Sequence, residues 1–155
     1  MARTGTTSNG RTVTILGVED AEGEWETVPA KPYGALVIAA GNERPDKLVF
    51  GKIANRLIET GCAWATLHGG KFTGKLHDIF DKAVVDYQLK HNPDVEMMTS
   101  GEDENSLEES MRDAVCFGFP SYGDRYDGLL VLVVGAPDTK LEEQAEALAK
   151  SVKPE

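Results

Sequence analysis

Two uninterrupted apolar runs constrain the fold of this chain more than any other feature. Residues 35–40 read ALVIAA and residues 129–134 read LLVLVV. Strands without polar alternation are typical of a sheet that is covered on both faces. The apolar stretches alternate with segments of helical spacing, and helices between strands require parallel pairing. The sequence therefore predicts a three-layer α/β/α sandwich with a mostly parallel sheet of about five strands, Rossmann-like or flavodoxin-like.

The pattern of apolar residues and turn signals divides the chain into strands and helices. The expected strands cover residues 12–18, 35–40, 62–67, 95–99 and 129–134, and the expected helices begin near residues 45, 73, 106 and 139. Leu48 is expected on the buried face of the first helix. Capping boxes are expected at Ser106 with Glu109 and at Thr139 with Glu142. Residues 1–11 are predicted to be a disordered tail and residues 12–155 a single α/β domain.

Composition and charge exclude several classes of partner. The 155 residues carry a formal charge of −10, which opposes binding to a nucleic acid polymer or an anionic membrane. No apolar run is long enough to span a bilayer, and no signal peptide is recognised, so a cytoplasmic location is expected. Cys62 and Cys116 lie far apart in apolar sequence, which favours burial over a metal site or disulfide. Neither a metal nor a cofactor is predicted.

A glycine- and lysine-containing segment between a strand and a helix is the strongest candidate for ligand binding. His68, Gly69, Gly70, Lys71 and Lys75 lie in the stretch HGGKFTGK. The spacing resembles a phosphate-binding loop, in which backbone amides and a helix N-terminus face the anion. The next residue is leucine instead of the Ser or Thr that holds Mg²⁺, so nucleotide hydrolysis there is not expected. An ordinary strand-to-helix turn is the alternative.

Other polar residues follow the expected strands. In a parallel sheet the turns after the strands converge on one edge, where ligands bind. Arg44, Thr99 and Ser100 are expected there as further ligand contacts. Glu102 and Asp103 could act with His68 as acid and base, or could simply complement the dipole of the following helix.

The segment 116–128, CFGFPSYGDRYDG, is richer in aromatic residues and glycine than a plain connection needs. Arg125 could supply bidentate contacts to phosphate, and Tyr122 and Tyr126 could cover a ligand. The same loop could instead be a packed surface loop or an interface between subunits.

Three segments in order, KPYGALVIAAG, LIETGCAWATLHGG and MMTSGEDENSLEES, resemble a family of small uncharacterised α/β proteins from bacteria and their viruses. The resemblance covers about residues 31–135. It differs at Gly101 and Glu102, where the family tends to show an aromatic residue and a histidine. The resemblance implies an α/β fold and brings no established activity.

The leading hypothesis is a non-catalytic domain that binds or sequesters a small phosphate-bearing ligand, such as a nucleotide-derived signal. One alternative is a small hydrolase of nucleotide-like substrates that uses His68 with Glu102 or Asp103. Another is a protein-interaction or immunity module. A homodimer is compatible with each of them.

Overall fold

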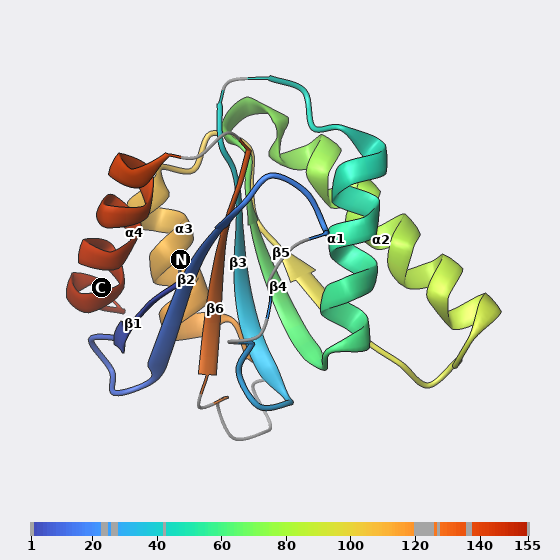
Figure 1. The fold of residues 1–155 in the computed structure, drawn as a ribbon, viewed down its shortest axis with the longest axis horizontal. Helices are drawn as coiled ribbons and strands as arrows, with labels where there is room; N and C mark the ends of the chain where they lie inside the picture. The colour runs from blue at the N-terminus through green and yellow to red at the C-terminus, as the bar shows by residue number, and fades with distance from the viewer. Residues whose placement is uncertain are drawn as a thin grey trace.

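A six-stranded sheet organises the residues that the structure describes, and five of its strands run parallel (Figure 1). The computed structural model describes residues 2–22, 25, 28–41, 43–119, 126, 128–135 and 138–154. The spatial order of the strands is β1-β2-β6-β3-β4-β5. Their bounds are Arg3–Thr6 (β1), Thr12–Val18 (β2), Tyr33–Ala39 (β3), Cys62–His68 (β4), Met98–Ser100 (β5) and Gly128–Val134 (β6). Only the pairing of β1 with β2 is antiparallel among these described strands.

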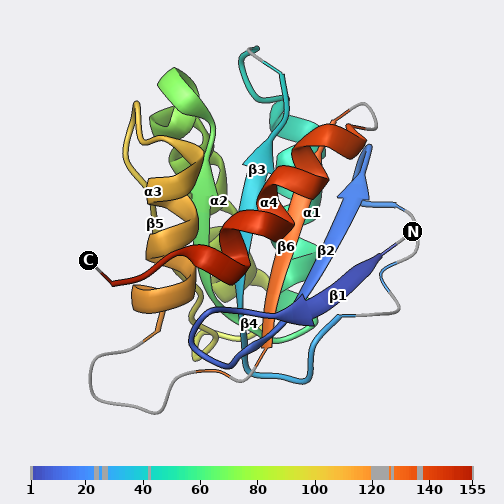
Figure 2. The ribbon, with the colours of Figure 1, turned by 90° about the vertical axis from the view of Figure 1, so that its left-hand side faces the viewer.

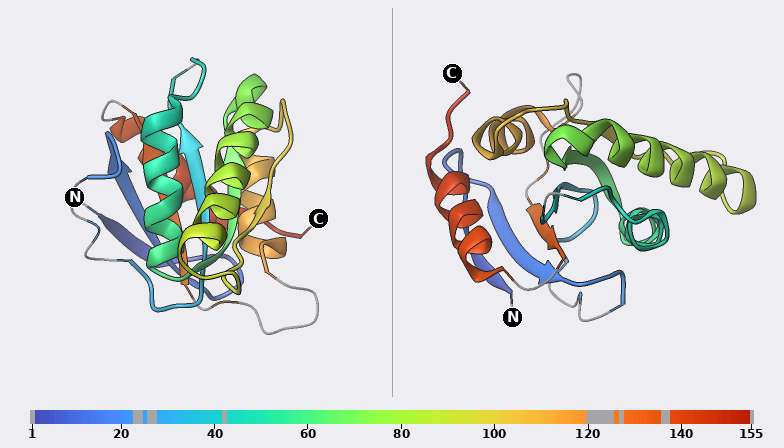
Figure 3. Two further views of the ribbon diagram at one scale, coloured as in Figure 1. Left: turned by 90° about the vertical axis from the view of Figure 1, so that its right-hand side faces the viewer. Right: turned by 90° about the horizontal axis from the view of Figure 1, so that it is seen from above.

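Helices lie on both faces of the sheet (Figures 2 and 3). They are α1 (Lys47–Glu59), α2 (Thr73–Lys90), α3 (Leu107–Arg112) and α4 (Thr139–Ser151), and a π-helical turn over Asp113–Phe117 continues α3. Helices α1 and α2 cover one face, and α3 and α4 cover the other. Each face has its own apolar cluster, with Leu57 and Leu76 in one and Met111 and Ala145 in the other. The predicted α/β class and mostly parallel sheet are confirmed.

Residues 2–11 include strand β1, at a place where the sequence analysis expected a disordered tail over residues 1–11. Strand β1 pairs with β2, and Arg3 forms ion pairs with Glu143 and Glu146 of α4. The backbone amide of Ser8 also donates to the carbonyl of Ala149 at 2.9 Å. Apolar periodicity in the sequence did not predict these contacts. The segment contributes few apolar side chains, and it pairs through backbone groups and through residues near its ends.

Capping residues define where the helices begin, and one of the two expected capping boxes is present. The box of Ser106 with Glu109 at the start of α3 is confirmed. Helix α4 instead begins after Asp138, whose carboxylate accepts from the amide of Leu141, so the box at Thr139 was wrong. Asp46 caps α1 in the same way. Aspartate one residue before the helix satisfies the free amides as serine or threonine would.

The strand order reverses direction between β6 and β3. From β3 the chain proceeds through α1 to β4 and through α2 to β5, whereas α3 carries it back across the other face to β6. The helices that follow β3 and β6, α1 and α4, therefore lie on opposite faces of the sheet, which is the arrangement at which parallel sheets bind ligands. No helix among the described residues is both long enough and apolar enough to cross a membrane.

Candidate functional site: a cationic groove between two helices

Most of the residues that the sequence proposes for a site follow parallel strands and lie at the carboxyl edge of the sheet. Arg44 follows β3, His68 ends β4 and leads into the segment up to Lys75, and Ser100 ends β5. Arg125 and Tyr122 lie outside the described residues. The described neighbours of that loop, Gly118 and Gly128, lie at the opposite edge, because β6 starts there and Gly118 is close to the start of β3.

Hydrogen bonds within the glycine loop and from Asp103 of a distant loop hold the glycine loop in place. A short 3-10 turn over Gly70–Phe72 leads into α2. The amide of Gly69 donates to Thr73 Oγ1 at 3.0 Å, and the amide of Gly74 donates to Asp103 Oδ1 at 2.7 Å. The Asp103 carboxylate thus occupies the position at the helix N-terminus where a phosphate would accept the same bond. The amide geometry therefore favours a structural turn at this place.

The Lys71 side chain contacts the aromatic ring of its neighbour Phe72. Its ammonium group lies 5.2 Å from the centre of the Phe72 ring, on the exposed side of the turn. Such a cation–π contact stabilises an exposed lysine modestly. Lys71 and Lys75, which the sequence places in one phosphate loop, therefore lie in different environments.

His68 is bonded to a serine rather than to a carboxylate. A hydrogen bond of 2.8 Å joins His68 Nδ1 and Ser110 Oγ, and Ser110 is only 1% exposed. Burial lowers the pKa of His68, so the imidazole is neutral at pH 7. Within the described residues no hydrogen bond or ion pair joins His68 to Glu102 or Asp103. The acid–base arrangement that a hydrolase would need is not assembled around His68 in this structure.

Thr99 and Ser100 serve opposite faces of the sheet, as neighbouring strand residues do. Thr99 Oγ1 donates to Asp81 Oδ1 of α2 at 2.7 Å. On the other face, Trp64 Nε1 donates to Ser100 Oγ at 3.0 Å. The two hydroxyls therefore do not face one common ligand.

A groove between α1 and α2 unites two of the sequence candidates, Arg44 and Lys75. The two helices lie side by side on the sheet (Figure 3, left). The groove has a volume of about 760 Å³, within the range of small-molecule sites. Six Lys and Arg side chains line it against three carboxylates. The cations are Arg44, Lys47, Lys52, Lys75, Lys82 and Lys90, and the carboxylates are those of Glu59, Asp78 and Asp86.

The groove cations are mostly unpaired. Lys82 bonds Asp86 at 2.8 Å. Within the described part of the chain, the other five lining cations form no ion pair. This concentration of positive charge stands on a chain whose formal charge is −10.

Two groove lysines oppose the dipoles of their own helices. Lys47 is the first residue of α1 and Lys75 the third of α2, and neither helix has an acidic residue in its first turn. Positive charge at a helix N-terminus is destabilising by about 0.3–1 kcal/mol. Folding alone does not favour these two positions for lysine.

Sequence analysis missed most of the groove. It placed Leu48 on the buried face of α1, but Leu48 is 68% exposed and lines the groove. The signal in the sequence was the pair Leu48 and Lys52 at spacing four, which puts both side chains on the same side of α1. That spacing is common on solvated helices and becomes informative only when α2 is seen beside it.

The described residues contain no group of three or more His, Cys, Asp or Glu side chains arranged to hold a metal ion. Cys62 and Cys116 are free and buried, as predicted. Burial raises the pKa of Cys62 to about 12 and also raises that of Cys116, so both thiols stay protonated.

The fold and the groove define an α/β protein with a mostly parallel sheet and a cationic surface groove. Comparison with protein families gives the family: residues 17–151 match the model of a domain of unknown function, DUF7684, and the chain belongs to that family. This confirms the resemblance to an uncharacterised family. Comparisons with curated proteins and with solved structures gave no match.

Proposed function

We propose that this protein is a non-catalytic binding domain of three-layer α/β/α architecture whose α1–α2 groove takes a small phosphate-bearing ligand. The observation that carries the proposal is the set of five groove cations that form no ion pair with any described residue, on a chain that is strongly acidic elsewhere. An acidic protein field repels anions, so a local excess of positive charge is what an anionic ligand requires. The protein would act by binding alone, as a sensor or a sequestering domain.

The proposed binding site is the groove, whereas the sequence favoured the glycine loop. In the loop, the amide of Gly74 already has a carboxylate partner. In the groove, Arg44 and Lys75 approach from the turn after β3 and from the first turn of α2, and Lys47 adds a third charge. Side chains from separate elements can surround a phosphate group, whereas the amides of Gly69 and Gly74 in the loop are already bonded.

Titration calorimetry with inorganic tripolyphosphate and with ATP tests this proposal. Hydrogen bonds to charged groups contribute about 1.5–3 kcal/mol, so Arg44→Ala, Lys47→Ala or Lys75→Ala should each weaken binding about tenfold or more. Lys71→Ala is the matched control, because Lys71 lies in the glycine loop outside the groove. No binding of either compound, or loss in Lys71→Ala with retention in Lys75→Ala, would overturn the proposal.

A further inference from the structure

The two ends of the α1–α2 groove differ in chemistry. Both helices follow strands of the parallel sheet, so both begin at its carboxyl edge and run in the same direction. The half of the groove near their N-termini is strongly cationic. It contains Arg44, Lys47, Lys52 and Lys75 against the single carboxylate of Asp78.

The other half of the groove is close to neutral and carries aromatic rings. Lys82 forms an ion pair with Asp86. The negative charge of Glu59 offsets the positive charge of Lys90 in the net charge of this half. The rings of Tyr87 and His91 lie with their centres 4.6 Å apart, tilted by 39°. Both residues line the groove. This end therefore offers flat apolar surface and little net charge.

Apolar side chains connect the two ends. Ile79 and Ala83 of α2 line the groove between Lys75 and Tyr87, and Gly51 lines it from α1. A Cβ atom at Gly51 would have no heavy atom within 4 Å, so the α1 wall is open at this point. From Lys75 to Tyr87 the helix rises by about 18 Å, at roughly 1.5 Å per residue. An elongated ligand can therefore lie along α2 and contact both ends.

We infer that the groove takes a nucleoside polyphosphate, with its phosphates among Arg44, Lys47 and Lys75 and its base against Tyr87 and His91. Phosphates match the cationic end in charge, and a base can stack on aromatic rings. A free polyphosphate would use the first end alone. The inference rests on the proposed function, and it adds the second half of the ligand and its orientation.

The energetic consequence is a preference for nucleotides over inorganic polyphosphate. Base–aromatic stacking contributes about 1–3 kcal/mol, which corresponds to a factor of roughly 5 to 150 in affinity. Base identity should matter little, because stacking requires only a flat ring. ATP and GTP are therefore expected to bind with similar affinity and at least about fivefold more tightly than tripolyphosphate.

Calorimetry on four proteins separates this inference from the proposed function. Tyr87→Leu keeps an apolar side chain against the core but removes the ring, and His91→Ala changes an exposed residue. Both should lower the affinity for ATP and leave that for tripolyphosphate unchanged. Lys75→Ala should lower both affinities. Thermal unfolding of each variant confirms that it is folded.

Chemical-shift mapping on the unaltered protein gives a second readout that does not depend on variants. Tripolyphosphate should shift amides near the starts of α1 and α2, and ATP should extend the shifts to Ala83 and Tyr87. The inference would be overturned by equal affinities for ATP and tripolyphosphate, with no effect of Tyr87→Leu on either affinity and no shifts beyond Ala83. That result would leave the proposed function standing. Binding of neither compound would overturn both. Binding of an acidic peptide alone would likewise overturn both.

Discussion

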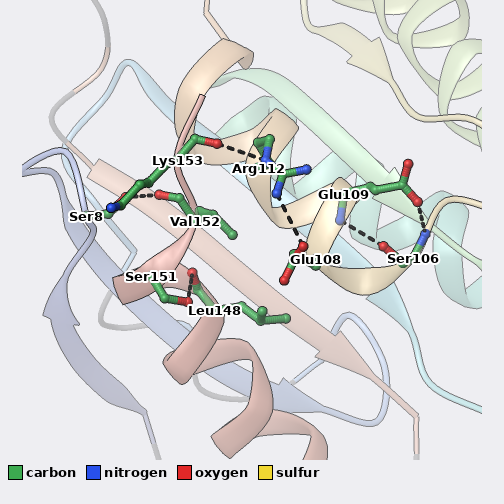
Figure 4. Close-up of polar contacts among 9 residues, drawn as sticks. All are labelled: Ser8, Ser106, Glu108, Glu109, Arg112, Leu148, Ser151, Val152 and Lys153. Atoms are coloured by element: carbon green, nitrogen blue, oxygen red, sulfur yellow. Dashed lines mark hydrogen bonds and ion pairs between the residues drawn. The ribbon is translucent and has the colours of Figure 1, made fainter. Parts of the chain in front are cut away.

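The two helical faces of the sheet differ in how their charged side chains are paired. On the α3–α4 face several charged groups have partners (Figure 4). Arg112 donates from Nε to the carbonyl of Lys153 at 2.8 Å and pairs with Glu108 at 3.2 Å, and Ser106 with Glu109 closes the start of α3. On the α1–α2 face, lysines stand in the first turns and five groove cations have no ion pair among the described residues.

The two faces also differ in whether the charges in the first helical turns agree with the helix dipole. Acidic residues in the first turns of α3 and α4 agree with the helix dipole, so folding itself favours them. Lys47 and Lys75 disagree with the dipole of their helices. A sequence that fits its fold at most levels and departs from it at one place usually departs at a functional site.

The largest expected effect is a loss of free energy of unfolding in core variants, which compares the packing of the two faces. Leu57 of α1 and Met111 of α3 are both fully buried, each in the cluster of its own face. Leu57→Ala and Met111→Ala should each lower the free energy of unfolding by about 3 kcal/mol, because each leaves a cavity. Urea denaturation measures both, with the exposed Leu89→Ala as control. A small effect on one face alone would show that the faces also differ in packing.

The next prediction compares how the helices of the two faces are capped. Asp103 caps α2 from a distant loop, whereas Ser106 caps α3 from the adjacent position. Asp103→Ala and Ser106→Ala should each destabilise the protein by about 1 kcal/mol. Glu102→Ala, at the exposed neighbour of Asp103, should change the stability by less than about 0.5 kcal/mol. If Asp103→Ala is neutral, the carboxylate does not hold the glycine loop closed.

Charge reversal should change stability with opposite sign on the two faces. Lys47→Glu and Lys75→Glu put negative charge in the first turns of α1 and α2, so each should stabilise the free protein by about 0.3–1 kcal/mol. Glu108→Lys should destabilise α3, because it reverses the charge in that first turn and breaks the pair with Arg112. Thermal unfolding at low salt and at about 1 M salt measures the effects, which salt should screen. Destabilisation by the groove variants would mean that their lysines support the fold.

Much of the fold was predictable from the sequence because apolar periodicity reports burial directly. The runs 35–40 and 129–134 became β3 and β6 at the centre of the sheet, and the expected start of α2 at residue 73 was confirmed. Strand β1 was not predictable in this way. It pairs at the edge through backbone groups, which leave no apolar pattern in the sequence.

The candidate site was predictable in part. Parallel pairing placed Arg44 and Lys75 at one edge, and this followed from the order of strands and helices. The closure of the glycine loop by Asp103 joins residues 29 positions apart, and nothing in the local sequence of either indicates it. The same is true of the bond between His68 and Ser110, 42 positions apart. Such contacts depend on how the helices dock, which periodicity does not specify.

The smallest predicted effect concerns pH and belongs to the α3–α4 face. Burial lowers the pKa of His68 from its ordinary value of 6.5, while its ring stays bonded to Ser110 of α3. In the unfolded chain the imidazole binds a proton near pH 6.5, whereas in the folded protein it does so only at lower pH. The unfolded state therefore holds more protons in this window, and the free energy of unfolding should fall as the pH drops below about 6.5.

His68→Gln should remove this loss, because the amide can still bond Ser110 but does not titrate. Urea midpoints at about pH 7.5 and 5.5, above the range of ordinary carboxylates, measure the difference between the two proteins. His77→Gln, which removes a partly exposed imidazole of α2 from its contact with Asp81, is the matched control. An equal loss in the His68 variant would assign the pH dependence to other groups. The expected result would assign the loss of stability below about pH 6.5 to the α3–α4 face, where His68 contacts Ser110 of α3.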